Sequence, residues 1–329
     1  MKPLISILVP MYNCEKKIRR CLDSLILQQP SVFETVILDD GSTDRGYEIV
    51  LEYEKKYGFI HAYHQQNAGV AAARQKLLEL AQGEYLMFCD ADDFFEPDAV
   101  AFVYQLLNNR NSGNAGGNSF DTIVYGYNLV RTHMKRTVYG RQLKEGIHTK
   151  KEFARLHVNG LNDLYWSSSC NKCYKAEICR TPQVIQYEKS IEDIMFNVDY
   201  LSRCRNIYVA RKPLYNYVQI GESLTRTKPA KNVGENALAE AYQVYMTLHD
   251  KVACAYPEQK EGNMKNTYFM MRKLTATASR INENGLCDKL LKEAGGIKKE
   301  MGMKALFWDG EYVMKKILQS IKAAARRFL

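Results

Sequence analysis

The sequence predicts an α/β fold, in which a mostly parallel sheet carries helices on both faces and is followed by a helical region. Two observations predict the sheet: short β-branched runs alternate with stretches of helical periodicity, and polar clusters stand where each strand would end. From about Ala230 onward the periodicity becomes almost wholly helical. At 329 residues the chain exceeds the usual size of one domain, so we expect a domain at residues 1–228 and a helical region at 229–329.

The first hundred residues show the strand and helix alternation most clearly. A β-branched run at residues 4–9 stops at Pro10, which predicts a buried strand. Apolar residues then recur at helical spacing from about Glu15 until Pro30, which predicts the first helix. The same alternation predicts strands at 33–38, 59–64 and 84–89, and helices at 44–57 and 70–81. Such alternation is typical of parallel sheets that are covered on both faces.

The next hundred residues follow a less regular pattern. A stretch rich in Gly and Asn at residues 108–119 predicts a surface loop, since it has little to bury. Strands at 120–130 and 136–141 are expected to extend the sheet, and helices near Lys150 and Glu192 to flank it.

Composition excludes several classes of protein. The net charge is +9, but no block of Lys and Arg is interleaved with aromatic residues, so a nucleic-acid partner is not expected. The nine cysteines are scattered, which indicates reduced thiols in a cytoplasmic protein, and the single CxxC at Cys170 and Cys173 lacks a second pair for zinc. No run resembles a signal-peptide core or a membrane span.

The polar clusters fall where the predicted strands end, and ligands of open α/β sheets bind beyond the carboxyl ends of the strands. We therefore expect four strand ends to converge on one crevice. The candidate residues, in chain order, are Pro10, Tyr12 and Asn13; Asp39 and Asp40; Asn67 and Gly69; and Asp90, Ala91 and Asp92.

Asp90 and Asp92 stand two residues apart after the fourth strand. Their oxygens could hold Mg²⁺ or Mn²⁺ while diphosphate oxygens complete the coordination, and such an ion would neutralise a departing diphosphate. The alternative is a solvated acidic turn that caps the helix beginning near Pro97.

Asp39 and Asp40 are adjacent carboxylates before Gly41, which permits a tight turn. Because like charges repel, the pair favours a donor-rich ligand such as a nucleobase imide or a ribose, although helix capping explains the neighbouring Asp44. Arg74 opens the helix after Gly69 and can reach a phosphate, or can be solvated on an outer face.

Glu192 and Asp193 open a further amphipathic helix. A carboxylate pair at this position stabilises the helix dipole. Alternatively, Asp193 is a general base that removes a proton from an acceptor hydroxyl, supplied from a different segment than the metal ligands.

Together these motifs resemble family 2 of the inverting glycosyltransferases with the GT-A fold, particularly bacterial enzymes that build capsular and cell-surface polysaccharides. The resemblance covers about the first 225 residues, and one departure is Cys173, where relatives often carry Leu. The matching motifs, in the family's order, lie at residues 6–13, 38–44, 67–69 with Arg74, 90–93, 171–174, 191–193, 215–217 and 223–225.

The resemblance implies a role for each motif in transfer from a nucleotide diphosphate sugar. It implies that Asp92 binds Mn²⁺ or Mg²⁺ and that Asp193 is the catalytic base of a single displacement with inversion. An imide partner at Asp39 favours a UDP-sugar. Donor contacts are expected from Pro10, Tyr12, Asn13, Asp39, Asp40, Asn67, Gly69, Arg74, Asp90 and Ala91, and acceptor-side contacts from Glu192, Asn171 and Lys172. The acceptor would be a glycan or a lipid-linked glycan, and residues 1–228 the nucleotide-sugar-binding and catalytic domain.

The C-terminal segment after Met303 carries no family signature. It forms a basic amphipathic pattern that can lie on anionic lipid at the inner face of the cell membrane, or can dock on the protein's own core. The apolar positions are Phe307, Met314, Ile317, Ile321, Ala324 and Phe328, and the basic ones are Lys315, Lys316, Lys322, Arg326 and Arg327.

Three other functions were weighed against glycosyl transfer. A sugar nucleotidyltransferase would open with a Gly-rich loop after its first strand, and Pro10 to Asn13 cannot serve as one. A phosphatase with Asp90 as nucleophile would carry that residue after the first strand of its core. A non-catalytic sugar-nucleotide binder would lack the base, and the presence of Asp193 favours catalysis.

Overall fold

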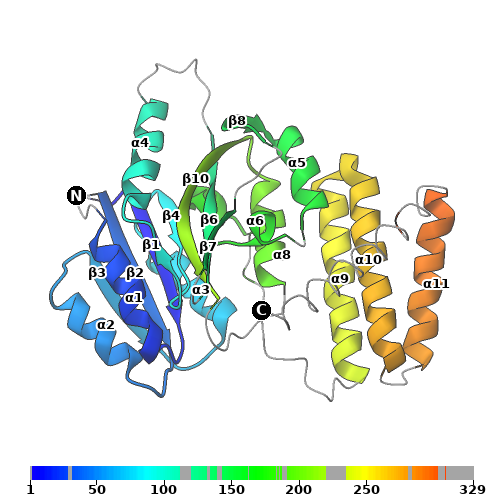
Figure 1. Cartoon of the computed structure of the whole chain (residues 1–329), viewed down its shortest axis with the longest axis horizontal. Coiled ribbons are helices and arrows are strands. Elements are labelled where there is room, and N and C mark those ends of the chain that lie inside the picture. Colours follow the sequence, from blue (N-terminus) through cyan, green and yellow to red (C-terminus); the bar gives the residue numbers. More distant parts are fainter. Residues whose placement is uncertain are drawn as a thin grey trace. The chain divides into compact units, whose positions relative to one another are not determined.

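A computed structural model (Figure 1) describes residues 2–28, 32–111, 120–131, 134–138, 143–161, 163–182, 184, 186, 191–219, 235–280, 284–302 and 308. The chain divides into two compact units, Met1–Thr225 and Arg226–Leu329. The boundary predicted at residue 228 falls outside the described residues, so its position stays a prediction.

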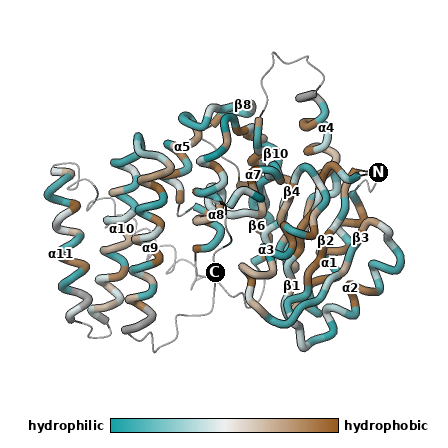
Figure 2. The backbone as a smooth tube through the Cα atoms, turned by 180° about the vertical axis from the view of Figure 1, so that it is seen from behind, coloured by the Kyte–Doolittle hydropathy of each residue, from teal (hydrophilic) through white to brown (hydrophobic). Residues whose placement is uncertain are grey.

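The first four strands form the parallel part of the sheet, in the order β3-β2-β1-β4. Apolar side chains are buried along β1, β2 and β4, and Figure 2 shows hydrophobic residues gathered there. This burial explains why these segments read as nearly continuous apolar runs. Their bounds are β1 Ile5–Met11, β2 Phe33–Asp40, β3 Ile60–Gln65 and β4 Tyr85–Phe88.

Three helices connect these strands: α1 (Glu15–Ile26), α2 (Gly46–Glu54) and α3 (Val70–Leu80). α1 packs against α2, whereas α3 packs against β1 and β2. The strand order reverses between β3 and β4, so right-handed crossovers place α3 on the sheet face opposite α1 and α2. The reversal creates a switch point between β1 and β4, where ligands of such sheets bind.

Beyond β4 the sheet is mixed, with β9 antiparallel to both β4 and β6, and β6 parallel to β10. The α/β fold is confirmed, but the parallel arrangement is limited to the first four strands and the β6–β10 pair. Strand direction depends on where the preceding connection ends, which the residue pattern does not encode. The strands of this part are β5 Phe94–Phe95, β6 Thr122–Arg131, β7 Met134–Val138, β8 Gly146–Thr149, β9 Lys172–Lys175 and β10 Asn206–Val218.

Further helices flank this part of the sheet. α5 begins at a capping box, in which Thr149 and Glu152 satisfy each other's backbone N–H groups. These helices are α4 Ala99–Asn111, α5 Lys150–Asn159, α6 Leu164–Ser167, α7 Ala176–Cys179 and α8 Glu192–Leu201.

The surface loop predicted at residues 108–119 is wrong at its start, because α4 continues to Asn111. Residues 112–119 lie outside the described chain.

The second unit contains α9 (Glu235–Ala255), a 3₁₀ turn η3 (Pro257–Gln259), α10 (Lys260–Arg280) and α11 (Asn284–Met301). Buried residues including Tyr268 form its own hydrophobic core. No described helix is long and apolar enough to cross a membrane. Apart from Trp308, the basic segment predicted after Met303 lies outside the described residues.

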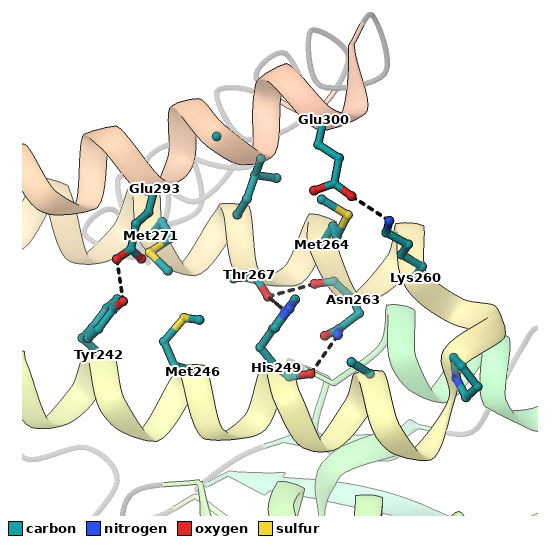
Figure 3. Close-up of a pocket in the computed structure, with 14 residues that line it drawn as sticks. Tyr242, Met246, His249, Lys260, Asn263, Met264, Thr267, Met271, Glu293 and Glu300 are labelled. Carbon is teal, nitrogen blue, oxygen red and sulfur yellow. Dashed lines mark hydrogen bonds and ion pairs between the residues drawn. The ribbon is translucent and has the colours of Figure 1, made fainter.

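A cavity of about 660 Å³ lies between the helices of this unit (Figure 3). Its lining is largely apolar, and its polar groups are already paired. The Tyr242 hydroxyl donates to Glu293 at 2.6 Å, and Lys260 pairs with Glu300 at 2.6 Å. The described lining residues hold no pair of unneutralised carboxylates, which distinguishes this cavity from the strand-end site described below.

Gly41 combines a left-handed backbone with a close approach to another segment of the chain. Its φ is +74°, and an added Cβ would stand 2.6 Å from the backbone nitrogen of Asn67. We expect Gly41→Ala to lower the free energy of unfolding by roughly 1–3 kcal/mol, because the left-handed backbone and the close approach are both penalised. Urea unfolding measures this, with Gly58→Ala as the control, since an added Cβ there meets no atom within 4 Å. Equal stability of the two variants would contradict the prediction.

Candidate active site

The loops after β1 and β2 are tied together by Asn13. Its side-chain oxygen accepts from the backbone N–H of Thr43 at 2.8 Å, and its own backbone N–H donates to the Ser42 hydroxyl at 2.8 Å. Asn13 adopts a positive φ of 50°, a conformation that Asn tolerates better than most residues. Its side chain therefore shapes the loops, and the donor contact expected of this exposed residue stays a prediction.

Asp40 closes the turn that follows β3. One carboxylate oxygen accepts from the Gln65 side chain at 2.7 Å and from the Ala68 N–H at 2.9 Å, and the other accepts from the Gly69 N–H at 2.9 Å. The residue is 4% exposed. Its oxygens hold the turn that begins α3, and the donor contact expected of Asp40 stays a prediction.

Asp39 is fully buried at the end of β2. Its carboxylate accepts from the backbone N–H and the hydroxyl of Ser42, and lies 2.8 Å from Nδ1 of His64. A carboxylate offers about four acceptor positions, so these three contacts leave room for one further N–H. His64 was not predicted as a site residue, and its position at the end of β3 is the signal that could have found it.

The centre of the site is an ion-pair cluster around Arg74, on α3. Its Nη1 lies 2.5 Å from Oδ1 of Asp193, and its Nη2 lies 3.6 Å from Oδ1 of Asp90. The Arg74 side chain is only 7% exposed. Residues far apart in the chain are therefore brought together, as the sequence analysis predicted for the carboxylates.

Burial and the charges within this cluster shift the pKa values of its side chains. Burial alone would lower the pKa of Arg74, but the carboxylates of Asp193 and Asp90 outweigh it and raise that pKa. The pKa of Asp90 is raised, mainly by burial. The charge of Arg74 opposes this rise, and the charges of Asp193 and Asp92 add to it. Burial and the neighbouring Asp193 also raise the pKa of Glu192. The site thus has more carboxylates than cations and favours a further positive group.

Asp92 stands at the more exposed side of this cluster. Its carboxylate pairs with Lys17 at 3.2 Å, both side chains being about one-third exposed, and its carbonyl accepts from Arg20 at 2.6 Å. Asp93 points elsewhere, because its oxygens accept from the Tyr215 hydroxyl and the Val218 N–H at 2.7 Å each. Asp93 is therefore structural, and Asp92 is free to face a ligand.

A divalent ion bound to Asp92 would need ligands from outside the protein as well. The described residues contain no group of three or more His, Cys, Asp or Glu side chains that could hold a metal ion. A single carboxylate fits an ion whose remaining ligands are diphosphate oxygens and water.

The remaining predicted donor residues lie at the same strand ends. Tyr12 is 48% exposed directly after β1, where an aromatic ring can stack on a base. Pro10 is half-buried within β1, and Asn67 is exposed on the turn before α3. Ala91 is 3% exposed and offers no side-chain contact.

Two predicted acceptor contacts are not at the surface. Asn171 is 1% exposed and Lys172 is fully buried. Asn171 donates to the backbone carbonyls of Tyr125 and Tyr165, and Lys172 donates to that of Ser168. In this conformation they cannot touch an acceptor, because the chain around them covers both side chains.

Residues 6–163 match the sequence model of the family described as glycosyl transferase family 2. The chain is similar to EpsH of Bacillus subtilis (strain 168), at 30% identity over an alignment of 300 positions that covers 82% of this chain and 81% of EpsH. It is also similar to EpsJ of the same organism, at 28% identity over 258 residues, 78% of this chain and 72% of EpsJ. Both relatives are named as glycosyltransferases.

The fold is similar to that of S. aureus TarS 1-349, a crystal structure in complex with UDP-GlcNAc, with a TM-score of 0.63 and 22% identity. The match covers 84% of this chain and 72% of the TarS chain. At this identity the likeness establishes the fold.

Proposed function

Since this chain belongs to glycosyl transferase family 2, we propose that it moves a sugar from a UDP-sugar to an acceptor hydroxyl with inversion at the anomeric carbon. The observation that carries the proposal is the cluster in which Arg74 joins Asp90 and Asp193 from separate segments. Inversion requires a base on one side of the sugar and a stabilised leaving group on the other, and this cluster offers groups for both.

The donor end would use Tyr12 and Asp39 to hold the base. The exposed Tyr12 ring supplies a stacking surface. Asp39 is covered in this conformation and would have to be uncovered as the donor binds, and its remaining acceptor position then suits the imide N–H of uracil. Thymine presents the same imide, so a TDP-sugar is the nearest competitor. A complex of UDP-GlcNAc with TarS, which shares this fold, supports a UDP-sugar as donor.

The diphosphate end would use Arg74, Asp92 and Lys17. A divalent ion, Mn²⁺ or Mg²⁺, would supply Lewis-acid stabilisation of the leaving diphosphate when held by Asp92. Arg74 has five N–H donors, so it can contact a phosphate oxygen and still pair with Asp193. Lys17, 3.2 Å from Asp92, adds a second cation to this end of the site.

At the acceptor end, Asp193 would take the proton. The acceptor oxygen forms a bond to the anomeric carbon as the bond from that carbon to the diphosphate oxygen breaks, and the hydroxyl proton passes to the Asp193 carboxylate. Arg74 and the Ser169 N–H, at 2.5 and 3.2 Å, orient that carboxylate. Glu192 begins the same helix and lies beside Asp193, where it can contact the acceptor.

The acceptor is proposed to be a glycan or a lipid-linked glycan of a cell-surface polysaccharide. The resemblance to bacterial capsular-polysaccharide enzymes supports this. The basic amphipathic pattern after Met303 supports peripheral contact with anionic membrane at the cytoplasmic face, where a lipid-linked acceptor would be reached.

Donor and metal binding can be tested without knowing the acceptor. UDP-, TDP- and GDP-sugars are screened by thermal shift with Mn²⁺, and a UDP-sugar is expected to stabilise the protein most, by about 2.7 kcal/mol at 100 times its Kd. Asp92→Ala, or a chelator, should reduce this stabilisation because the diphosphate loses its cation. Asp98→Asn is the control, since Asp98 pairs with Lys212 away from the cluster. A UDP-sugar shift that neither Asp92→Ala nor a chelator changes would refute the metal role.

Asp193→Asn tests catalysis. The amide keeps the size of the carboxylate but accepts no proton, so turnover should fall by roughly 10²–10⁴-fold while donor binding is nearly unchanged. Transfer from the UDP-sugar found in the screen is measured by release of UDP, again with Asp98→Asn as control. Full turnover by Asp193→Asn would show that another group is the base, and absence of turnover in every variant and in the wild type would favour a non-catalytic binder.

Membrane contact is tested by removing the residues after Met303. The shortened protein should no longer sediment with anionic vesicles, because the clustered Lys and Arg charges and their apolar face are gone. Neutral phosphatidylcholine vesicles serve as the control. Unchanged binding to anionic vesicles would reject the segment as the membrane contact.

A further inference from the structure

Lys172 is a buried cation that the proposed reaction does not yet use. It opens β9 and is fully buried. Its Nζ donates to the Ser168 carbonyl at 2.5 Å, to Oδ1 of Asn171 at 2.9 Å and to the Tyr165 carbonyl at 3.4 Å. An ammonium group has three donors, and all three therefore have acceptors. Among the described residues, none of these acceptors carries a charge.

The Ser168 carbonyl and the Ser169 N–H belong to one peptide group. The carbonyl side accepts from Lys172, and the N–H side donates to Oδ2 of Asp193 at 3.2 Å. Because a trans peptide is planar, its C=O and N–H point in opposite directions. The ammonium and the carboxylate therefore stand at opposite ends of a single peptide dipole, each at the end that favours its charge.

We propose that Lys172 is a positioning residue for Asp193, which it orients through the Ser168–Ser169 peptide group. The inference rests on the proposed role of Asp193 as the base. A peptide polarised by an ammonium at its oxygen is a stronger hydrogen-bond donor at its nitrogen, because hydrogen bonds in series polarise one another. Arg74 holds the other oxygen of the same carboxylate, so the two cations fix it from two sides.

The surrounding polar groups hold this peptide in place. The single O–H of Tyr174 is shared between two acceptors, Oδ1 of Asn197 at 2.9 Å and the Ser169 carbonyl at 3.2 Å. Asn197, on α8, donates in turn to the Ser167 carbonyl and to that of Asp193. These hydrogen bonds connect the segment before β9 to the start of α8. They fix the position of the Ser168–Ser169 peptide group, and Lys172 sets its polarity.

Electrostatics agrees with the geometry. Burial lowers the pKa of Lys172 to about 7, and the charge of Asp193 opposes that lowering. Burial and the charge of Lys172 together lower the pKa of His157 to about 3, so the neighbouring imidazole is neutral at neutral pH. Below a pH of about 7, Lys172 therefore carries the positive charge on this side of Asp193.

Other groups also face Asp193 and must be unchanged in a test. They are Arg74 from α3, Asp90 after β4, Glu192 on α8 and Cys170 before β9. A substitution at Lys172 leaves each of these side chains in place.

Lys172→Met tests the inference, because Met matches the Lys side chain as far as Cε but has no donor and no charge. We expect kcat to fall roughly 10–100-fold, the factor for one charge-assisted hydrogen bond, with an unchanged KM for the UDP-sugar. The acidic limb of the pH profile of kcat should move to higher pH, because the ionised Asp193 loses stabilisation. Loss of folded protein alone lowers kcat without moving that limb.

Lys175→Met is the matched control, since Lys175 lies in the same strand and pairs with the exposed Glu177. Its kcat and pH profile should equal those of the wild type. If Lys172→Met does not fold, Lys172→Gln, which keeps an N–H donor without a charge, is measured in its place. A pH profile of the variant that superimposes on the wild-type profile would overturn the inference. Loss of turnover in Asp193→Asn alongside that result would leave the proposed function intact, whereas full turnover in Asp193→Asn would overturn the proposed function itself.

Discussion

The structure of the site depends on the burial of one arginine between carboxylates. Arg74 is 7% exposed, and a guanidinium in that position requires nearby negative charge, because removing one partner of a buried ion pair typically costs about 3–5 kcal/mol. Asp90 and Asp193 provide that charge from the end of β4 and the start of α8. The need to neutralise Arg74 thus brings the proposed donor end and acceptor end of the site together.

The position of Arg74 depends in turn on backbone geometry. Asp40 holds the turn before α3 through two backbone N–H groups, and Gly41 lets β2 approach that turn closely. Asn13 ties the loop after β1 to the loop after β2. Residues that resemble ligand contacts in the sequence therefore build the frame on which Asp39 and Arg74 are presented.

The periodicity of the sequence predicted the larger elements and failed for the smaller ones. β1 to β4 and α1 to α3 appear within a few residues of their predicted bounds, because each buries a regular apolar pattern. β5, β8 and β9 have two to four residues each, too few to show a period. The antiparallel direction of β9 also follows from the path of the preceding chain, which no local pattern records.

By itself, the sequence determined the family, the α/β class and the set of acidic residues at the strand ends, because these depend on residue types in order along the chain. Only the tertiary structure decided which of those residues are buried and which partners they contact. Asp39 and Asp40 are neighbours in sequence and are both buried, yet Asp39 contacts Ser42 and His64 whereas Asp40 holds the turn before α3. Lys172 likewise proved to be buried, since exposure and hydrogen-bond partners are set by the segments that pack around a side chain and not by its neighbours in the chain.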